Sequence, residues 1–185
     1  MTGRFVTIEG IEGAGKTTQA ERLAGALERA GWEAVRTREP GGPGRLGETL
    51  RDLLKDPEVW RSLELAEIYL YAAARAHHVE ALIRPALDRG AAVVCDRYLD
   101  STRAYQGYGR GRPLELIEAL HAHPPLERPP DRTVLLEVPP EVGLERSRQR
   151  AEDGAPGYDE ESLAFFRRVA GGFETIAEGD PARVR

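Results

Sequence analysis

The stretch Gly10-Ile11-Glu12-Gly13-Ala14-Gly15-Lys16-Thr17 decides the fold of this chain. It matches the pattern G-x-x-x-x-G-K-[ST] in full. An apolar, strand-like segment, 4–9, precedes it, and a helical pattern over 16–30 follows it. Glycines between a strand and a helix let successive backbone N–H groups face one anion, and the positive end of the helix faces the same anion. The stretch therefore predicts a nucleotide-phosphate site.

Within this loop, the side chains of Lys16 and Thr17 have separate expected tasks. We expect Lys16 to reach the β- and γ-phosphates and the hydroxyl of Thr17 to bind Mg²⁺. The predicted nucleotide-binding residues are Gly10, Ile11, Glu12, Gly13, Ala14, Gly15, Lys16, Thr17 and Thr18.

The rest of the chain alternates short apolar strands with amphipathic helices. Strands are expected at 4–9, 34–37, 91–95 and 133–138, with a start of a fifth at 182–185, and helices at 16–30, 46–55, 63–89, 113–121, 140–150 and 160–178. Pro85 is expected to bend or break the third of these helices. This alternation is typical of an α/β fold with a mainly parallel sheet in one domain, 1–185.

Composition excludes several classes of protein. The chain has 185 residues, 26 basic and 31 acidic, and a formal net charge of −5, which disfavours a partner role on nucleic acid. No apolar run is long enough to span a membrane, so a membrane is not expected as a partner. The single cysteine, Cys95, excludes an internal disulfide and a zinc cluster and suits a reducing cytoplasm.

The basic residues are almost all arginine. Only Lys16 and Lys55 are lysines, and asparagine is absent. One interpretation is a heat-adapted or GC-rich composition, which we take to explain most of the excess. The other is that some arginines build an anion site, because the guanidinium group binds phosphates bidentately.

Missing motifs narrow the kind of nucleotide-binding protein. Neither D-x-x-G nor N-K-x-D, which GTPases normally carry, occurs. Asp96 ends a buried strand and is followed by Arg97, not by the acidic residue that motor ATPases use to activate water. Transfer of phosphate to a bound acceptor is therefore favoured over transfer to water. At the carboxyl end of the strand, Asp96 can hold Mg²⁺ through its waters and Arg97 can bind a phosphate.

A set of further motifs resembles the thymidylate kinase family. They occur in the family's order after the phosphate loop: Thr37-Arg38-Glu39-Pro40-Gly41-Gly42, Tyr71-Ala72-Ala73-Ala74-Arg75-Ala76-His77-His78, Asp96-Arg97-Tyr98 with Ser101-Thr102, and Ala104-Tyr105-Gln106-Gly107. The resemblance extends to about Arg168. It implies a nucleoside-monophosphate-kinase fold, with a five-stranded parallel sheet flanked by helices on both faces. It also implies the reaction ATP + dTMP → ADP + dTDP, with Mg²⁺ as cofactor.

The resemblance also implies which residues bind dTMP. By position, Glu12 would hold the 3′-hydroxyl, Tyr71 would stack on thymine, Arg75 would contact the base, and Tyr105 would crowd the 2′ position and exclude ribose. The predicted substrate-binding residues are Glu12, Glu39, Pro40, Arg51, Tyr71, Arg75, Arg97, Thr102, Tyr105 and Gln106. Ala74 replaces the family's common aspartate, which puts an ion pair with Arg75 in doubt. His77 and His78 are interpreted as surface or packing residues.

A lid is expected over about 146–158, where Arg146-Ser147-Arg148-Gln149-Arg150 precedes an acidic segment with glycine and proline. As a bare pattern, this arginine run is also typical of a solvated helix face. Some family members carry a basic residue in the phosphate loop and others in the lid. Gly13 places this chain with the second type, so Arg148 or Arg150 is expected to reach the γ-phosphate. The predicted catalytic residues are Lys16, Asp96, Arg97, Arg148 and Arg150.

Two other functions remain open from the sequence. A deoxynucleoside kinase shares the fold but needs a carboxylate base, for which Glu39 is the candidate. A nucleotide-binding switch or ATPase would hydrolyse ATP slowly without an acceptor. The resemblance further suggests a bacterial source, a homodimer that packs through 63–87, and a chain that lacks the family's final adenine loop and helix.

Overall fold

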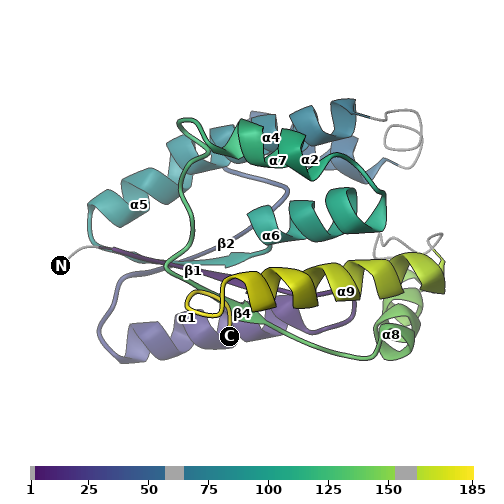
Figure 1. Ribbon diagram of the computed structural model, residues 1–185. Helices are drawn as coiled ribbons and strands as arrows, with labels where there is room; N and C mark the ends of the chain where they lie inside the picture. Colours follow the sequence, from purple (N-terminus) through teal and green to yellow (C-terminus); the bar gives the residue numbers. More distant parts are fainter. Residues whose placement is uncertain (1–2, 57–64, 153–161) are drawn as a thin grey trace.

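The computed structural model describes residues 3–56, 65–152 and 162–185, with the side chains of 150–152 left out. The elements, in chain order, are β1 (Arg4–Glu9), α1 (Lys16–Arg29), β2 (Ala34–Arg38), α2 (Gly44–Lys55), α4 (Ala66–His78), η1 (Val79–Ile83), α5 (Arg84–Asp88), β3 (Ala92–Asp96), α6 (Leu99–Thr102), η2 (Arg103–Gly109), α7 (Leu114–His121), β4 (Arg132–Leu135), α8 (Pro140–Glu152) and α9 (Leu163–Gly179). Figure 1 shows their arrangement.

The sheet is parallel, with the strand order β2-β3-β1-β4. This confirms the expected α/β fold but corrects the expected strand number, because the described part of the chain forms a four-stranded sheet. The segment at 182–185 does approach β4: Thr133 and Val184 form one parallel bridge. Three backbone hydrogen bonds accompany this bridge, from Thr133 N–H to the Arg183 carbonyl, from Arg185 N–H to the Thr133 carbonyl and from Leu135 N–H to the Arg185 carbonyl, but the pairing is too short to count as a fifth strand.

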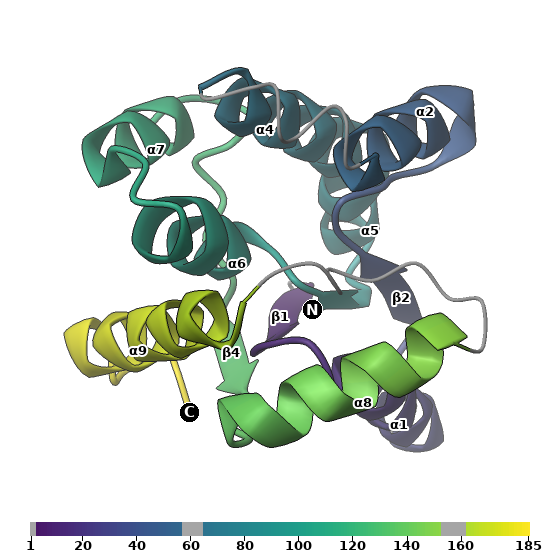
Figure 2. The same cartoon turned by 90° about the vertical axis from the view of Figure 1, so that its right-hand side faces the viewer.

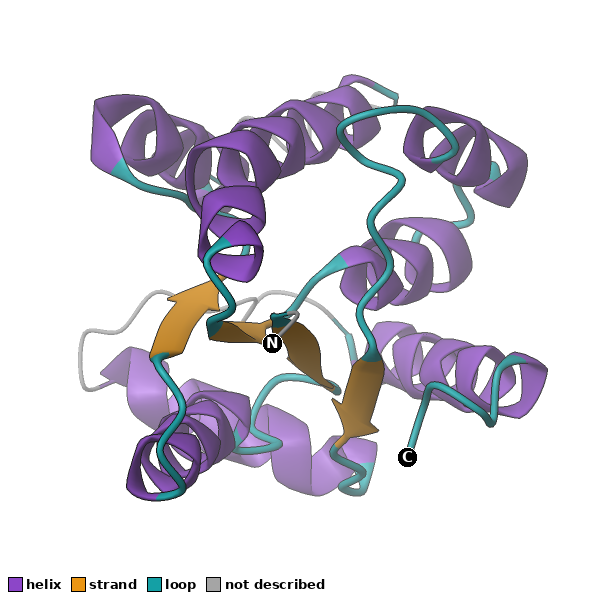
Figure 3. Cartoon of the chain, turned by 90° about the vertical axis from the view of Figure 1, so that its left-hand side faces the viewer, coloured by secondary structure: helices purple, strands orange, loops and turns teal. Residues whose placement is uncertain are grey.

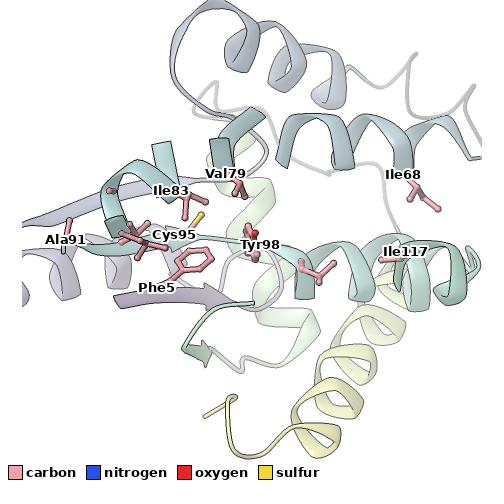
Figure 4. Packing of buried hydrophobic residues seen from close by; sticks show 12 residues of the cluster. Phe5, Ile68, Val79, Ile83, Ala91, Cys95, Tyr98 and Ile117 are labelled. Atoms are coloured by element: carbon pink, nitrogen blue, oxygen red, sulfur yellow. The ribbon is translucent and has the colours of Figure 1, made fainter. Parts of the chain in front are cut away.

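The central strand β3 is buried along its whole length. Val93 and Cys95 face the hydrophobic cluster that contains Phe5 and Ile83, whereas Val94 packs with Ile8 on the opposite face. Figure 4 shows the first cluster around Phe5 and Cys95. Burial on both faces explains why the strand reads as a continuous apolar run, as in parallel sheets covered by helices.

Helices cover both faces of the sheet. Figure 1 shows α1 on one side and α4, α5 and α7 on the other. Figure 3, seen from the left-hand side of Figure 1, shows the strands between these layers. The strands end on the side where α8 lies, and Figure 2 shows α8 crossing in front of α1 there. The loops at this edge therefore carry the residues that a ligand would meet.

One helical region agrees with the sequence prediction and another was missed. The α-helix expected over 63–89 is interrupted just before Pro85, because the π-helical turn η1 separates α4 from α5, which has Pro85 in its first turn. Residues 57–64 lie outside the described part of the chain. The elements α6 and η2, over 99–109, were not predicted, because this segment is buried on most sides and shows no amphipathic period. Within the described residues, no helix combines the length and apolar character that crossing a membrane requires.

Candidate active site

The phosphate loop connects β1 to α1 as the sequence predicted. Gly13 and Gly15 adopt left-handed backbone conformations, with φ of 74° and 89°, which the absence of a Cβ allows. Lys16 is buried and its Nζ donates to the carbonyl of Ile11 at 2.6 Å. Burial and the nearby Arg97 lower the pKa of Lys16 to about 7. A bound phosphate anion would reverse this shift by favouring the ammonium form.

The candidate magnesium ligands lie side by side. The Thr17 hydroxyl donates to Oδ2 of Asp96 at 2.5 Å, joining the start of α1 to the end of β3. Both are oxygen donors, the ligands that Mg²⁺ prefers. The described residues include no group of three or more His, Cys, Asp or Glu that would hold a metal by themselves. A small oxygen set of this kind fits an ion that also keeps waters and phosphate oxygens.

One cavity of about 290 Å³ brings the predicted residues together at this edge. Every predicted substrate-binding residue lines it, as do Gly13, Gly15, Lys16, Thr17, Thr18 and Asp96 from the phosphate-loop side. Gly10, Ile11 and Ala14 of the predicted set are not among its lining residues. The motifs are far apart in sequence, so the fold assembles this cavity from several elements.

Arg75 is fixed at one end of the cavity. Its guanidinium group donates to Glu39 at 2.8 Å, to the Thr102 hydroxyl at 3.0 Å and to His121, whose Nε2 lies 2.6 Å away. Burial opposes ionisation of Glu39, but Arg75 and His78 outweigh it and lower the pKa of this carboxyl.

These contacts correct one sequence interpretation of this end and agree with another. Ala74 does not deprive Arg75 of an ion pair, because Glu39 supplies one. Glu39 is engaged with Arg75 and His78, and it is 6% exposed. His78 is a buried packing residue, as interpreted, and its Nε2 lies 2.7 Å from the Thr37 hydroxyl.

In the middle of the cavity, Glu12, Arg97 and Tyr105 form one cluster. Arg97 Nη2 donates to Glu12 at 2.6 Å and to the Tyr105 hydroxyl at 3.2 Å, and Tyr105 also donates to Glu12. The guanidinium carbon of Arg97 lies 4.8 Å from the centre of the Tyr105 ring. Burial opposes ionisation of Glu12, but Arg97 and Lys16 outweigh it and lower its pKa.

A second group of cations lines the cavity between β2 and α2. Arg51 Nη1 donates to the carbonyl of Pro40 at 2.5 Å, and burial together with Arg38 lowers its pKa. Burial, Arg51 and Arg38 lower the pKa of Lys55. Cations that repel one another in this way favour an anionic ligand between them.

Several residues that line the cavity had no predicted role: Arg38, Leu54, Lys55, Tyr98, Ser101 and Ser147. Arg38 ends β2, so the rule that ligands bind beyond the carboxyl ends of strands would have identified it. The contribution of Ser147 depends on how α8 packs, which a single sequence does not reveal.

The beginning of the predicted lid, α8, packs directly on the phosphate loop. A Cβ at Gly143 would lie 2.6 Å from the carbonyl oxygen of Glu12, so only glycine allows this approach. Arg146 donates to the carbonyl of Gly13 at 3.2 Å, and Ser147 is buried at the cavity wall. Arg148 is exposed and does not line the cavity.

Part of the predicted lid is not described. The side chain of Arg150 and residues 153–158 lie outside the described residues. Position 150 is nevertheless placed on α8, four residues after Arg146 and three after Ser147, so it shares their helix face.

Comparisons with known proteins agree in one assignment. The family model described as thymidylate kinase matches residues 8–184. A thymidylate kinase of Thermomicrobium roseum is 50% identical over 181 residues, covering 98% of this chain and 84% of the relative, and that of Desulfosudis oleivorans is 47% identical over 184 residues, covering 97% and 86%. The crystal structure of thymidylate kinase from Ehrlichia chaffeensis superposes with a TM-score of 0.80 at 34% identity, covering 100% of this chain and 92% of that one.

Proposed function

Because this chain belongs to the thymidylate kinase family and phosphorylates dTMP to dTDP with ATP, we propose that its cavity holds the two nucleotides with their phosphates facing each other. The observation that supports this arrangement is the convergence of three charge groups on one cavity: Lys16 with Asp96, Arg97 with Glu12, and Arg75 with Glu39. Lys16 and Asp96 mark the ATP end, and Arg75 marks the thymine end.

At the ATP end, the loop amides and Lys16 would bind the β- and γ-phosphates. Thr17 and Asp96 would hold Mg²⁺, with Asp96 acting through a water. The ion would neutralise charge on the β- and γ-phosphate oxygens when it is bound. The ammonium group of Lys16 would then help to align the transferred phosphate, because its flexible side chain can follow that group as it moves.

At the thymine end, Tyr71 on α4 would stack on the base, and Arg75 together with Thr102 and Gln106 would bind its polar edge. All four line the cavity, and the three polar side chains among them are almost fully buried. Polar groups held in a dry cavity discriminate strongly, since a wrong base leaves them without partners. The Glu39 and Pro40 loop closes this end beside Arg75.

Between the two ends, the sugar and the acceptor phosphate would meet Glu12, Tyr105, Arg97 and Arg51. Glu12 can accept a hydrogen bond from the 3′-hydroxyl, and Tyr105 leaves little room for a 2′-hydroxyl. Arg97 and Arg51 would bind the phosphate of dTMP. That phosphate is already anionic near neutral pH, so transfer needs alignment and charge neutralisation and no general base.

This account disfavours the deoxynucleoside kinase alternative. That reaction needs a carboxylate free to take a proton from a neutral hydroxyl, and Glu39 was its candidate. Here the Glu39 carboxylate is bound to Arg75 and His78, and its pKa is lowered, which weakens it as a base. The phosphate-binding arginines would also have no acceptor phosphate to bind.

The test is a comparison of Michaelis constants. Arg97→Ala should raise the KM for dTMP at least tenfold and leave the KM for ATP within about twofold, because in the proposed arrangement the guanidinium group binds the phosphate of dTMP and no group of ATP. Lys16→Ala should weaken ATP instead and lower kcat. If Arg97→Ala left the KM for dTMP unchanged, the proposed arrangement of the two nucleotides would be wrong.

We also propose a cytoplasmic homodimer. The single cysteine, Cys95, is buried and free, which fits a reducing compartment. The largest exposed apolar side chains of α2 and the start of α4 are Leu46, Leu53, Leu65 and Tyr69, a set that a second copy could cover. Sedimentation should give a dimer that Tyr69→Asp together with Leu46→Asp converts to a monomer; a monomeric parent chain would contradict the proposal.

A further inference from the structure

One buried carboxylate beside the phosphate loop has no proposed role in binding either nucleotide. Glu9 ends β1 immediately before the phosphate loop and is 1% exposed. Burial and the nearby Asp100 raise its pKa to about 7. A carboxylate in such a place is costly, so its contacts need an explanation.

Both oxygens of Glu9 bind the segment that carries Arg97. The backbone N–H of Tyr98 donates to Oε1 at 2.7 Å, and the hydroxyl of Ser101 donates to Oε2 at 2.6 Å. Ser101 is 9% exposed and lies on α6. The carboxylate thus ties the end of β1 to the turn that follows β3.

That turn has an unusual backbone conformation at Arg97. Among the described residues, Arg97 is the one non-glycine residue with positive φ, at 71°. Such a conformation is unfavourable for an L-residue and persists only where neighbours hold it. Here the Arg97 N–H donates to the Ile8 carbonyl at 3.0 Å, and the next N–H, of Tyr98, is held by Glu9.

Ser101 also contacts the guanidinium group of Arg97. Arg97 Nη1 donates to Ser101 Oγ at 2.9 Å and to the Gly10 carbonyl at 3.0 Å. Ser101 gives its single hydroxyl hydrogen to Oε2 of Glu9. The lone pairs of Ser101 then face Arg97. Nη1 is anchored in this way, while Nη2 contacts the cavity residues Glu12 and Tyr105.

We propose that Glu9, acting through Ser101, is a positioning residue that sets the orientation of Arg97 for the phosphate of dTMP. This inference rests on the acceptor-phosphate role proposed for Arg97. Glu9 itself touches no substrate. Glu9 fixes the backbone turn and the direction in which the Ser101 hydroxyl donates. Nη1 of Arg97 therefore stays bound to Ser101, and Nη2 faces the ligand.

The test measures the dissociation constant of dTMP by calorimetry, without ATP, and the KM for ATP. Ser101→Ala removes the acceptor for Nη1, and Glu9→Gln places an amide donor where Ser101 needs an acceptor. Each should weaken dTMP about tenfold, the effect of losing one hydrogen bond to a charged group, and leave the KM for ATP within about twofold. Ser101→Thr, which keeps the hydroxyl, should recover most of the affinity lost in Ser101→Ala.

Controls separate positioning from a general loss of structure. Thr7→Val, also on β1, removes a buried hydroxyl that pairs with Thr133 at 2.7 Å, and it should lower the melting temperature without changing dTMP affinity. In an Arg97→Ala background, Ser101→Ala should have no further effect on dTMP affinity, because the two act through one guanidinium group.

The outcomes are distinguishable. If Arg97→Ala itself leaves dTMP affinity unchanged, the role proposed for Arg97 fails, and the inference fails with it. If Arg97→Ala weakens dTMP but Ser101→Ala does not, the positioning role alone is overturned. The same holds if the effects of Arg97→Ala and Ser101→Ala on dTMP affinity add in full.

Discussion

Arg75 shows how a single buried charge is held ready for a ligand. Arg75 is 2% exposed, yet Glu39, His121 and Thr102 each contact one of its three nitrogens, and the guanidinium carbon lies 4.9 Å from the centre of the Tyr98 ring. A base that entered the cavity would therefore meet an oriented guanidinium group. Preorganisation of this kind lowers the cost of ordering on binding.

The buried Glu39–Arg75 pair allows a prediction about stability. Glu39→Ala should lower the free energy of unfolding by about 3–5 kcal/mol, because it leaves Arg75 buried without its counter-charge. Chemical denaturation measures the change. Glu33→Ala is the matched control: its pair with Arg89 is about half exposed, so the loss should be at most about 1 kcal/mol. Equal losses in the two variants would contradict this account of Arg75.

His121 predicts a pH dependence. Burial and Arg75 lower its pKa from 6.5 to about 4, and its Nε2 accepts from Arg75 while Nδ1 faces the Ile117 carbonyl. As pH falls below about 6.5, the unfolded chain binds this proton and the folded chain does not, so stability is lost between about pH 6.5 and 4. His121→Gln should flatten this part of the stability curve. An unchanged slope would show that His121 does not cause it.

At the residue scale, the sequence predicted which side chains meet in the cavity but not how they pair. Family motifs identified Glu39, Arg75 and Thr102 separately. Their contacts depend on the relative placement of β2, α4 and α6, which no local pattern encodes. For the same reason, His121 on α7 escaped notice although it contacts Arg75.

Among the elements, α8 packs so closely on the phosphate loop that a side chain at Gly143 has no room. Gly143→Ala should disturb this packing, because the new Cβ would lie 2.6 Å from Glu12 O and 2.7 Å from Ile11 Cδ1. We expect a loss of about 1–3 kcal/mol and a raised KM for ATP, measured by thermal unfolding and steady-state kinetics. Gly171→Ala on α9 has open space and should instead stabilise by up to about 1 kcal/mol. Normal ATP kinetics in Gly143→Ala would argue against α8 acting on this loop.

The position of Arg150 on α8 favours it over Arg148 as the catalytic arginine of the lid. Arg150→Ala should lower kcat by about 10³ or more while dTMP affinity changes little, because an arginine that reaches the γ-phosphate acts in the transition state. Arg148 is exposed on another face, so Arg148→Ala should have the smaller effect. Rapid-quench kinetics would separate chemistry from product release. An unchanged kcat in both variants would remove these arginines from catalysis.

Element boundaries followed from sequence where local signals were strong. The strand before the phosphate loop and the helix after it were predicted within one residue, since the glycine motif sets both ends. The α6–η2 region was missed because its burial against α9 removes the amphipathic signal. The fifth strand was expected both from the pattern at 182–185 and from the family resemblance, and this segment contributes one bridge with three backbone hydrogen bonds to the sheet.

For the whole molecule, the parallel sheet explains why distant motifs act together. The motifs after β1, β2 and β3 stand at the same edge because these strands are parallel neighbours in register. Groups proposed to bind phosphate thus converge from three strand ends. The arginine excess can be divided in the same way, since few of the arginines whose side chains are described line the cavity: Arg38, Arg51, Arg75 and Arg97.

The most direct test of the central claim is turnover by the purified chain with ATP and Mg²⁺ over a panel of acceptors. The panel is dTMP, dUMP, dGMP, thymidine and no acceptor, with ADP release followed in a coupled assay. We predict rapid turnover with dTMP, slower turnover with dUMP, and none above background with dGMP, thymidine or no acceptor. Turnover of thymidine, ADP release without an acceptor, or equal rates for dTMP and dGMP would contradict the account.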